Sequence, residues 1–498
     1  MIDTAALQSK IIDLAIQGKL TEQLPTDGNA EDLYQQIQAE KAQLIKEKKI
    51  KKNKPLPEIT AEEIPFDVPD NWKWVRLGEI ASKISSGNTP PGGKKSDAYV
   101  KEGYSFFREQ NIYNDGIRLE GLVYISGELL EKRPNSTVLP KDILLNITGG
   151  SIGRCAIVPD DFTKGSINQH ILIIRMINPE FRAYVHNYIC SEQGQKYIKG
   201  NAIGDKDGFS GGRCKTMPIP LPPLSEQERI VAKLDEVLAE IKIIDELQSQ
   251  YASNVDALKS KIIDAGIRGQ LTEQLPEDGT AEELYQTIQE EKAQLIKDKK
   301  IKKEKPLPEI TADEIPFEIP ANWKWVRLRD IVQIINGDRG KNYPAKSTLS
   351  HEGIPFISAL NLNGDGITED DRLLCLTDEQ YNRLGSGKLE RNDIVICIRG
   401  SIGKHGRYPY DKGAIASSLV ICRPYIYLDE IGCFIMKWLK SYLFVNEIGK
   451  YDGGSAQPNL AADNLKKFLV PLPPLSEQKR IVAKINDVFG ALDERDRL

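Results

Sequence analysis

The sequence predicts a duplicated fold in which two similar domains are joined by long amphipathic helices. The first sign is a repeat: "IPLPPLSEQERIVAKLDEVL" begins at Ile219, and "VPLPPLSEQKRIVAKINDVF" begins at Val470, 251 residues later. The second sign is that Trp72 and Trp323 keep the same spacing of 251 residues. The third is that two long segments between the copies match only in outline. A shared frame with two divergent inserts is expected of a protein with two different recognition tasks.

The repeat closes into a ring. In its register Leu498 corresponds to Leu247 and Met1 corresponds to Ala252, so that only residues 248–251 lack a counterpart. The chain therefore has the order of a two-unit ring that is opened within one repeat. This order predicts a molecule with pseudo-twofold symmetry and adjacent termini.

The divergent segments, 80–218 and 331–469, are expected to share one fold and to carry different surfaces. "FFREQNIYNDGI" in the first faces "FISALNLNGDGI" in the second, and "GGSIGRCAIVP" faces "RGSIGKHGRYP". Recent recombination is the alternative explanation for the likeness of the flanking copies. The first segment holds 18 basic and 14 acidic residues and the second holds 17 and 16, whereas the whole chain has a net charge of −5. The divergent segments are thus the less acidic part, which is consistent with contact to nucleic acid.

The first frame element is a helix that follows Pro222 and Pro223. Apolar residues recur at steps of three and four over about 40 residues, the pattern of a long amphipathic helix; they are Ile230, Leu234, Val237, Ile241, Ile244, Leu247, Tyr251, Val255, Leu258 and Ile262. Ser225 and Glu228 predict a capping box at its start, and Gly266 and Gly269 mark its end.

The partner of this helix has to be assembled from both chain ends, 476 onward and 1 to about 16. We expect the two helices to bury their stripes against each other as an antiparallel pair. The alternative is a helix that packs only on its own domain.

A second helix in each copy ends in a basic run. Lys48, Lys49, Lys51, Lys52 and Lys54 form this run in the first copy. Such runs are most often solvated, and contact with DNA phosphates or a partner is the alternative. Beyond the run, Trp72 and Trp74 are expected to anchor a domain core.

Composition excludes several classes of protein. A chain of 498 residues is too long for one hydrophobic core, and no apolar run approaches the roughly 20 residues of a membrane span. A cytoplasmic protein is therefore expected. The seven cysteines and four histidines are scattered, without a CxxC or HExxH motif, so we expect buried thiols and no metal site.

The motifs of the obvious DNA enzymes are missing. A methyltransferase needs a motif such as Asn-Pro-Pro-aromatic, and the nearest string is "NPEF" at Asn178. A nucleotide-driven motor needs GxxxxGK[ST], and "GNTPPGGKKS" at Gly87 places Gly93 where the lysine should be. No catalytic triad is identifiable from spacing. The sequence therefore favours a binding protein without catalytic residues.

The "PLPPLSEQ" turn into a helix, the "P-x-x-W-x-W-V-R-L" entry and the circular repeat resemble the specificity (S) subunit of type I restriction-modification enzymes, over essentially the whole chain. The resemblance implies an α/β (α+β) fold with two mixed α/β target recognition domains and two long conserved helices packed as an antiparallel coiled-coil pair. It divides the chain into an N-terminal conserved helical region (1–75), a first recognition domain (76–219), a central conserved helical region (220–326), a second recognition domain (327–470) and a C-terminal conserved helix that pairs with the N-terminal region (471–498).

The resemblance also implies a function and partners. Each recognition domain would read one half of an asymmetric, bipartite duplex DNA target, and the helices would set the gap. The chain would be non-catalytic and would bind no cofactor. Two methyltransferase subunits, and two motor-nuclease subunits in the restricting complex, would carry S-adenosylmethionine, ATP and Mg²⁺.

Residues that read bases are sought in loops rich in Arg, Asn, Gln and Ser, because Arg suits guanine and Asn or Gln suits adenine in the major groove. The candidates in the first domain are Asn88, Thr89, Arg108, Asn111, Ser151, Arg154, Asn168, Gln169 and Arg213. Those in the second are Arg339, Asn361, Asn363, Arg399, Ser401, Lys404, Ser417, Ser455, Gln457 and Asn459. The alternative at each position is an ordinary turn residue.

Two other functions stay open at this point. One is a protein-interaction scaffold built on the long helices, with no role on DNA. The other is a stand-alone enzyme whose catalytic residues are not evident from spacing.

Overall fold

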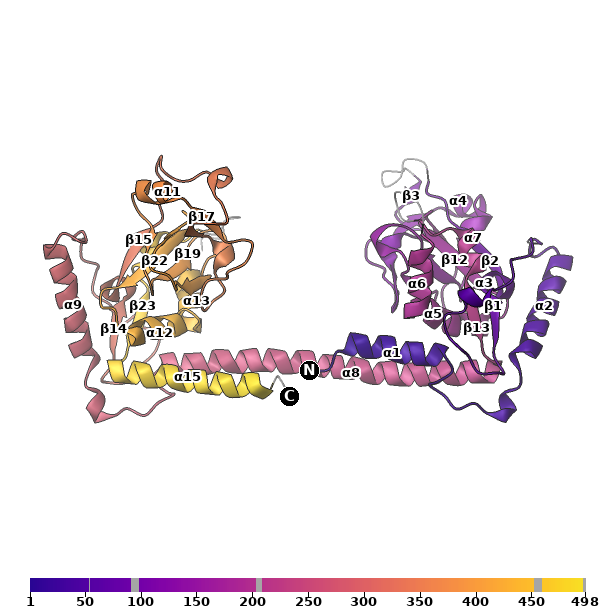
Figure 1. The fold of residues 1–498 in the computed structure, drawn as a ribbon, viewed down its shortest axis with the longest axis horizontal. Coiled ribbons are helices and arrows are strands. Elements are labelled where there is room, and N and C mark those ends of the chain that lie inside the picture. Colours follow the sequence, from indigo (N-terminus) through magenta and orange to yellow (C-terminus); the bar gives the residue numbers. More distant parts are fainter. Residues whose placement is uncertain (53, 91–97, 203–207, 452–458, 496–498) are drawn as a thin grey trace. The chain divides into compact units, whose positions relative to one another are not determined.

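The computed structural model describes residues 1–52, 54–90, 98–202, 208–451 and 459–495. Its contacts divide the chain into two compact units: Ile2–Gln248 form the first, and Ser249–Leu498 together with Met1 form the second. Each unit contains long helices and one domain of mixed helices and strands (Figure 1). The α/β fold class predicted from the sequence is confirmed.

The frame helices lie where the periodicity predicts them. They are α1 (Thr4–Ile16), α2 (Ala30–Lys46), α8 (Leu224–Ile267), α9 (Ala281–Lys297) and α15 (Leu475–Arg495). Helix α8 is continuous over 44 residues, and its end is followed by Gly269 at φ +70°. A positive φ favours glycine, which explains the stop.

The start of α8 corrects one expectation. The helix begins at Leu224, one residue before Ser225, so that Ser225 does not cap it. The Ser225 hydroxyl instead donates to Asp27 Oδ1 at 3.0 Å. Glu228 is exposed, whereas Glu226 is fully buried.

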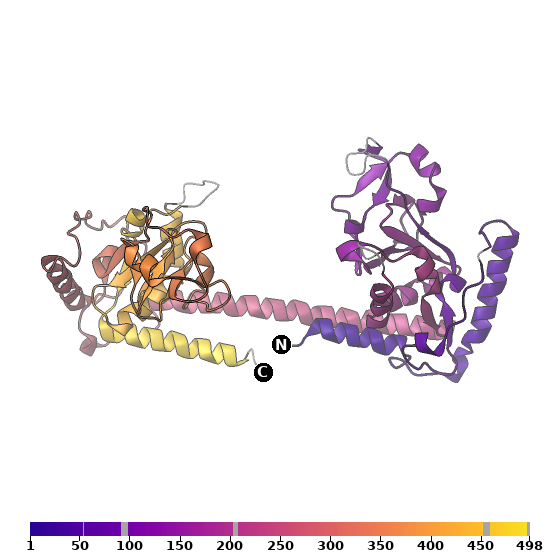
Figure 2. The ribbon, with the colours of Figure 1, turned by 45° about the horizontal axis from the view of Figure 1, so that its top comes forward.

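In each unit a shorter helix packs antiparallel on α8 (Figures 1 and 2). In the first unit Thr4 Oγ1 donates to Asp245 Oδ1 at 2.8 Å, while Ile16 at the other end of α1 shares a buried core with Ile230. In the second unit Lys259 Nζ lies 2.5 Å from Asp493, and Gly266 approaches α15 so closely that a Cβ there would lie 3.0 Å from Ile481.

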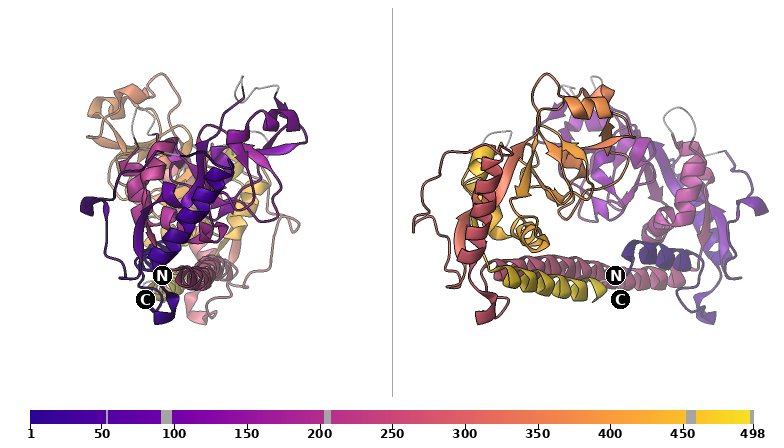
Figure 3. Two further views of the ribbon diagram at one scale, coloured as in Figure 1. Left: turned by 90° about the vertical axis from the view of Figure 1, so that its right-hand side faces the viewer. Right: turned by 60° about the vertical axis from the view of Figure 1, so that its left-hand side comes forward.

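The expected antiparallel helix pair is therefore confirmed within each unit. The right-hand view in Figure 3 follows α15 along α8. The alternative, packing on the unit's own domain, also holds in part, because Ile230 and Leu234 belong to the same core as the domain's sheet. Leu247, Tyr251 and Leu258 remain 41–58% exposed, so part of the predicted apolar stripe is uncovered.

The first domain is built on two main sheets. The four-stranded sheet has the order β10-β9-β12-β2, and the five-stranded sheet has the order β3-β7-β4-β11-β8. The strands are β2 (Ala81–Ser86), β3 (Tyr99–Val100), β4 (Tyr104–Phe107), β5 (Ile112–Tyr113), β6 (Gly116–Ile117), β7 (Val123–Ile125), β8 (Thr137–Val138), β9 (Ile143–Asn146), β10 (Cys155–Ile157), β11 (Gly165–Ile167) and β12 (Ile171–Met176). The helices are α3 (Leu77–Ile80), α4 (Gly127–Glu131), α5 (Arg182–Cys190), α6 (Glu192–Gly200) and α7 (Gly211–Thr216).

The second domain repeats this plan. Its sheets have the orders β15-β22-β19-β20 and β17-β16-β21-β18. The strands are β15 (Val332–Asn336), β16 (Ile354–Ile357), β17 (Leu374–Leu376), β18 (Lys388–Leu389), β19 (Ile394–Cys397), β20 (His405–Arg407), β21 (Gly413–Ile415) and β22 (Leu419–Pro424). The helices are α10 (Leu328–Ile331), α11 (Asp378–Arg383), α12 (Asp429–Trp438), α13 (Tyr442–Gly449) and α14 (Ala462–Leu465). One fold with different surfaces is what the outline match of the two segments predicts.

Each domain is closed at its base by a strand pair from the repeated frame. β1 (Lys73–Arg76) pairs antiparallel with β13 (Pro218–Leu221), and β14 (Lys324–Arg327) pairs with β23 (Leu469–Leu472) in the same way. The chain thus enters and leaves each domain through adjacent strands. "PLPPLSEQ" is the exit from that pair into a frame helix.

A buried carboxylate fixes each exit to the entry. Trp72 Nε1 donates to Glu226 Oε2 at 2.8 Å, and Trp323 Nε1 donates to Glu477 Oε2 at 2.8 Å. Burial raises the pKa of Glu226, although the hydrogen bonds from Trp72 and Gln23 favour its charged form. The expected role of Trp72 as an anchor of the core is confirmed.

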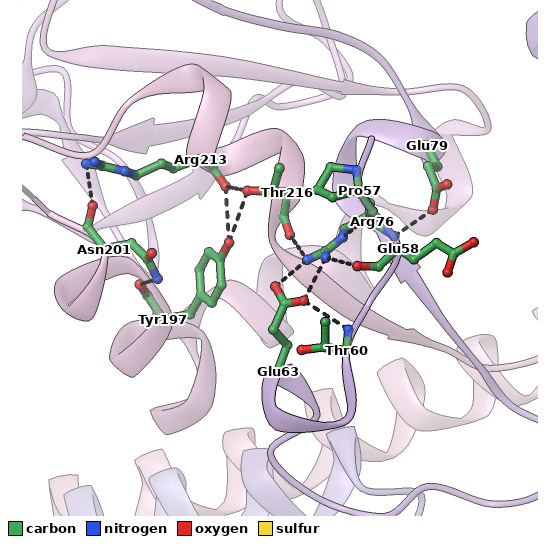
Figure 4. A network of polar contacts seen from close by, with 10 residues as sticks. All are labelled: Pro57, Glu58, Thr60, Glu63, Arg76, Glu79, Tyr197, Asn201, Arg213 and Thr216. Atoms are coloured by element: carbon green, nitrogen blue, oxygen red, sulfur yellow. Dashed lines mark hydrogen bonds and ion pairs between the residues drawn. The ribbon is translucent and has the colours of Figure 1, made fainter. Parts of the chain in front are cut away.

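Arg76 joins the entry strand to the linker that precedes it (Figure 4). Its guanidinium pairs with Glu63 at 2.7 Å and donates to the carbonyls of Pro57, Glu58 and Thr216. The hydrogen bonds from Arg76 lower the pKa of Glu63 to about 2. Arg327 and Glu314 repeat the pair in the second unit.

Candidate nucleic-acid interface

The strand order of the first domain brings several loops together at one end of its sheets. β2 and β9 end at the edge where the antiparallel strand β12 begins, since Ser86 and Leu145 both pair with Leu172. β4 and β11 are parallel and also end there, where Asn168 N donates to Phe107 O at 3.1 Å. We call the loops 87–90, 108–111, 147–154 and 168–170 the first loop edge.

The first loop edge carries most of the residues predicted for this domain. Asn88 and Gln169 are exposed, and Thr89, Ser151 and Arg154 are half-buried. The Arg154 guanidinium lies 4.6 Å from the centre of the Tyr113 ring. Topology therefore gathers side chains that are up to 81 residues apart in the sequence, from Asn88 to Gln169.

Arg108 and Asn168 belong to the same edge but already have partners. Arg108 Nη2 donates to the Gly121 carbonyl at 2.5 Å, while its Nε is buried without a partner among the described residues. Asn168 is 5% exposed, and its amide donates to Glu109 Oε2 at 2.6 Å. Burial alone would raise the pKa of Glu109, but the Asn168 hydrogen bond, a backbone hydrogen bond and the nearby His170 and Arg108 together lower it.

Two predicted base-reading residues are structural. Asn111 is fully buried, and its amide donates to the carbonyls of Arg118 and Glu120. Its counterpart Asn361 is 1% exposed and accepts from the Ser358 backbone at 2.9 Å. Each asparagine shapes the turn that follows a parallel strand and has no surface to offer a base, which corrects the expectation for both.

Arg213 is half-buried and is not part of the four loops that define the first loop edge. It sits on α7 and donates to the Asn201 carbonyl at 2.7 Å (Figure 4). The guanidinium of Arg213 is thus hydrogen-bonded within its own domain.

The second domain has an equivalent second loop edge, which we define as loops 337–343, 358–361, 398–404, 416–418 and 459. β15 and β19 end where β22 begins, since Asn336 pairs with Val420 and Cys397 with Leu419. The parallel strands β16 and β21 end there as well. Leu460 N donates to Ile398 O at 2.9 Å and so brings the segment before α14 to the same edge.

The second loop edge is more exposed and more basic than the first. Arg339, Arg399, Ser401, Lys404 and Asn459 are exposed. Arg399 Nε donates to Asn459 Oδ1 at 3.1 Å, and Arg339 Nη2 donates to the carbonyl of the half-buried Ser417 at 3.2 Å.

Three more residues were predicted to read bases in this domain, and only Asn363 lies among the described residues. Asn363 is exposed, but its side-chain oxygen accepts from the backbone of Asp365 and Gly366 in a local turn. Ser455 and Gln457 lie outside the described residues.

Sequence reasoning missed one matched pair, Gln110 and Leu360. Both are exposed on the turn after a parallel strand, and Leu360 is 61% exposed. Leu360 borders a cavity of about 550 Å³ that Tyr343, Phe356 and Ala416 also line. The comparison of "FFREQNI" with "FISALNL" contained the signal, since a glutamine there faces a leucine.

Two features are absent from the described residues. Among them, no group of three or more His, Cys, Asp or Glu side chains could hold a metal ion. In the same part of the chain, no helix is long and apolar enough to cross a membrane. The arrangement is suited to hydrogen bonding and apolar contact with the edges of bases, and to contact with phosphates.

The chain is similar to known proteins over most of its length. The family model described as "Type I restriction modification DNA specificity domain" matches residues 69–250 and 320–496. The chain is 29% identical to the EcoAI specificity subunit of Escherichia coli, over 97% of this chain and 88% of the relative. It is 26% identical to the EcoEI specificity subunit of Escherichia coli, over 98% of this chain and 89% of the relative.

A solved structure that describes assembly and conformational transition of the type I restriction-modification system contains a chain with the same fold. The TM-score is 0.61 at 20% sequence identity, and the match covers 87% of this chain and 94% of that chain. The family match spans both loop edges and both strand pairs at the domain bases. The chain therefore belongs to the family of type I restriction-modification DNA specificity domains.

Proposed function

We propose that the chain is the DNA specificity subunit of a type I restriction-modification enzyme. Each loop edge reads one half of an asymmetric, bipartite duplex target, and the helices α1, α8 and α15 set the gap between the halves. Arg, Asn, Gln and Ser side chains at the edges read bases in the major groove, and basic side chains position the phosphates.

The observation that carries this proposal is that matched loops hold unmatched side chains. Ser151 and Ser401 occupy the same turn in the two domains, but Arg399 stands where the first domain has Gly149. Gln110 faces Leu360 in the same manner. Two edges of one fold with different chemistry suit two different half-sites.

The base-reading residues proposed here are those that present a side chain at a described loop edge. They are Asn88, Thr89, Arg108, Gln110, Ser151, Arg154, Gln169, Arg339, Leu360, Arg399, Ser401, Lys404, Ser417 and Asn459. Asn168 holds Glu109 in place, and Asn363 holds its own turn. The recognition domains are taken to run over 76–219 and 327–470, with the frame outside them.

Catalysis is assigned to partner subunits. Two methyltransferase subunits that bind S-adenosylmethionine would modify adenine, and two motor-nuclease subunits that use ATP and Mg²⁺ would join them for cleavage. The relatives in E. coli are specificity subunits of type I restriction enzymes, which supports this division of labour. They do not favour a scaffold without a role on DNA.

Selection from a random duplex library tests the proposal. The full chain, assembled with its methyltransferase subunits, is expected to enrich two short motifs at a fixed separation. A complex that enriches no bipartite motif would contradict it and would favour the scaffold. Methyl transfer to DNA by the chain alone would favour an enzyme instead.

A further inference from the structure

Both units carry a groove at the same place in the repeated frame. In the first unit it lies between the end of α2, the edge strand β2 and α7, and has a volume of about 440 Å³. In the second unit its counterpart lies between the end of α9, the edge strand β15 and the segment of α14, with about 510 Å³. We call them the first and the second groove.

Two cations of the second groove, Lys466 and Arg329, are paired with the chain's own carboxylates, and Lys292, Lys300, Lys302 and Lys303 line the groove as well. Glu304 Oε1 lies 2.9 Å from Lys466 Nζ, and Glu304 Oε2 lies 3.2 Å from Arg329 Nη2. Asp463 lies 2.9 Å from the same lysine. The carboxylates of Glu304 and Asp463 are thus the anions that contact Lys466 and Arg329 in this groove.

The first groove lacks these acids. In the register of the repeat, Lys215 corresponds to Lys466, but the counterparts of Glu304 and Asp463 are Asn53 and Gly212. Lys215 and Lys51 form no ion pair or side-chain hydrogen bond with a described residue. Lys51 and Lys215 therefore lack the carboxylates that pair with Lys466 in the second groove, whereas Lys49 is paired with Glu47 and Arg175 with Asp142.

Two further differences also make the first unit more positive. Lys83 lies opposite Arg175 in the antiparallel strand register, and at the same place in the second unit Gln333 lies opposite Arg423. Arg423 is held by both Asp393 and Glu390, whereas Arg175 is held by Asp142, and Leu139 occupies the position of Glu390.

Five positions differ in charge between the two units, and over them the first unit is more positive by three charges. The second unit has Glu304, Glu390, Asp463 and Gln333 where the first has Asn53, Leu139, Gly212 and Lys83, and it has Arg329 where the first has Gly78. Burial and the neighbouring Arg175 lower the pKa of Lys83 to about 8, as expected of a cation crowded by another cation.

The first groove is continuous with the first loop edge. It is lined by Ala81–Ser85 of β2, which runs on through Ser86 into Asn88. Arg133 precedes the groove residue Pro134, and its guanidinium donates to the Asn88 carbonyl at 2.6 Å. Arg133 thus places one positive charge between the first groove and the loop 87–90.

We propose that the first groove, through Lys51, Lys83 and Lys215, binds backbone phosphates of DNA that flanks the half-site read by the first domain, whereas Glu304 and Asp463 weaken phosphate binding in the second groove. This inference rests on the proposed function and adds a sequence-independent contact that is stronger on one side of the target. Phosphate contacts of this kind contribute affinity and salt dependence without base preference.

Salt dependence of DNA binding tests the groove. The full chain, assembled with its methyltransferase subunits, is titrated with a duplex that carries its selected target, from 50 to about 300 mM KCl. Replacing both Lys51→Gln and Lys215→Gln is expected to reduce the slope of log K against log salt by about 1 to 2, and to weaken binding about threefold to tenfold. The preference for target over a scrambled duplex should not change. Lys52→Gln, in the same basic run but outside the groove lining, is the matched control.

The opposite change provides an independent arm. Glu304→Gln together with Asp463→Asn opens the second groove, so the slope should become steeper by about 1 and affinity should rise. Thermal unfolding of each variant identifies any loss of fold.

Three results would contradict phosphate binding in the first groove. One is an unchanged slope in both variants of folded protein, and another is a changed target preference. The third is loss of methyltransferase assembly at unchanged slope, which would assign the groove to acidic side chains of the partner. Absence of any selected target in the unaltered complex would instead contradict the proposed function itself.

Discussion

At the residue scale, the proposed recognition of each half-site depends on which side chains the loop edges present. Leu360 is the clearest case, because a 61% exposed leucine borders a cavity that the Tyr343 and Phe356 rings help to line. Apolar side chains recognise the C5-methyl group of thymine in the major groove. Gln110, at the matched position, has the amide that suits adenine.

We expect the half-site of the second domain to include a thymine whose methyl group contacts Leu360. Replacing thymine by deoxyuridine in that half-site should weaken binding about fourfold, the effect of exposing one methyl group of roughly 0.8 kcal/mol. The same replacement in Leu360→Gln should change affinity little, and a binding titration measures both. Equal sensitivity of the wild type and the variant would assign the methyl contact elsewhere.

The sequence predicted residue types at these edges better than residue roles. Asn111 and Asn361 have the right chemistry for adenine and stand in loops, yet each is buried and bonded to its own turn. Burial depends on how neighbouring strands end, which a single sequence does not state. Leu360 was missed for the opposite reason, because a leucine is expected inside.

At the element scale, the repeated frame is held by polar contacts that occur twice. Arg229 pairs with Asp27 at 2.5 Å, and Arg480 pairs with Asp278 at 2.5 Å. Each pair ties the second turn of a frame helix to the loop that precedes α2 or α9. The hydrogen bonds from Arg229 lower the pKa of Asp27 to about 2, from an ordinary value of 3.8.

A pKa that is lower in the folded chain stabilises the fold above the unfolded pKa. That stabilisation is present at pH 6 and is lost as the pH falls from about 4 towards 2. We therefore expect Asp27→Asn to lower the free energy of unfolding at pH 6 and to differ less from the wild type at pH 3. Urea unfolding at the two pH values measures this difference.

Asp278→Asn is the matched control, because Arg480 lowers the pKa of Asp278 in the same way. It should act with the same sign in the second unit. A constant difference between Asp27→Asn and the wild type at both pH values would mean that the ion pair does not stabilise the frame.

The frame was the part of the fold best predicted from sequence. Steps of three and four between apolar residues located α8, and Gly269 its end, because these signals are local. The capping box was wrong, since Ser225 donates to Asp27, which is 198 residues away. The many short strands of the domains have no comparably strong period and could be assigned only through the family resemblance.

At the scale of the whole molecule, the central claim is that two domains of one fold read two different half-sites independently. The matched strand pairs at the domain bases and the matched buried carboxylates Glu226 and Glu477 make the two domains interchangeable in the frame. Residues 80–218 and 331–469 are then the exchangeable pieces.

Methylome sequencing of cells that carry the complete system, with either the natural chain or a chain in which residues 80–218 also replace 331–469, tests this claim most directly. The natural chain should yield an asymmetric bipartite motif. The altered chain should yield the first half-site twice, as an inverted repeat across a gap. An unchanged motif, or a symmetric motif from the natural chain, would contradict the assignment of one half-site to each domain.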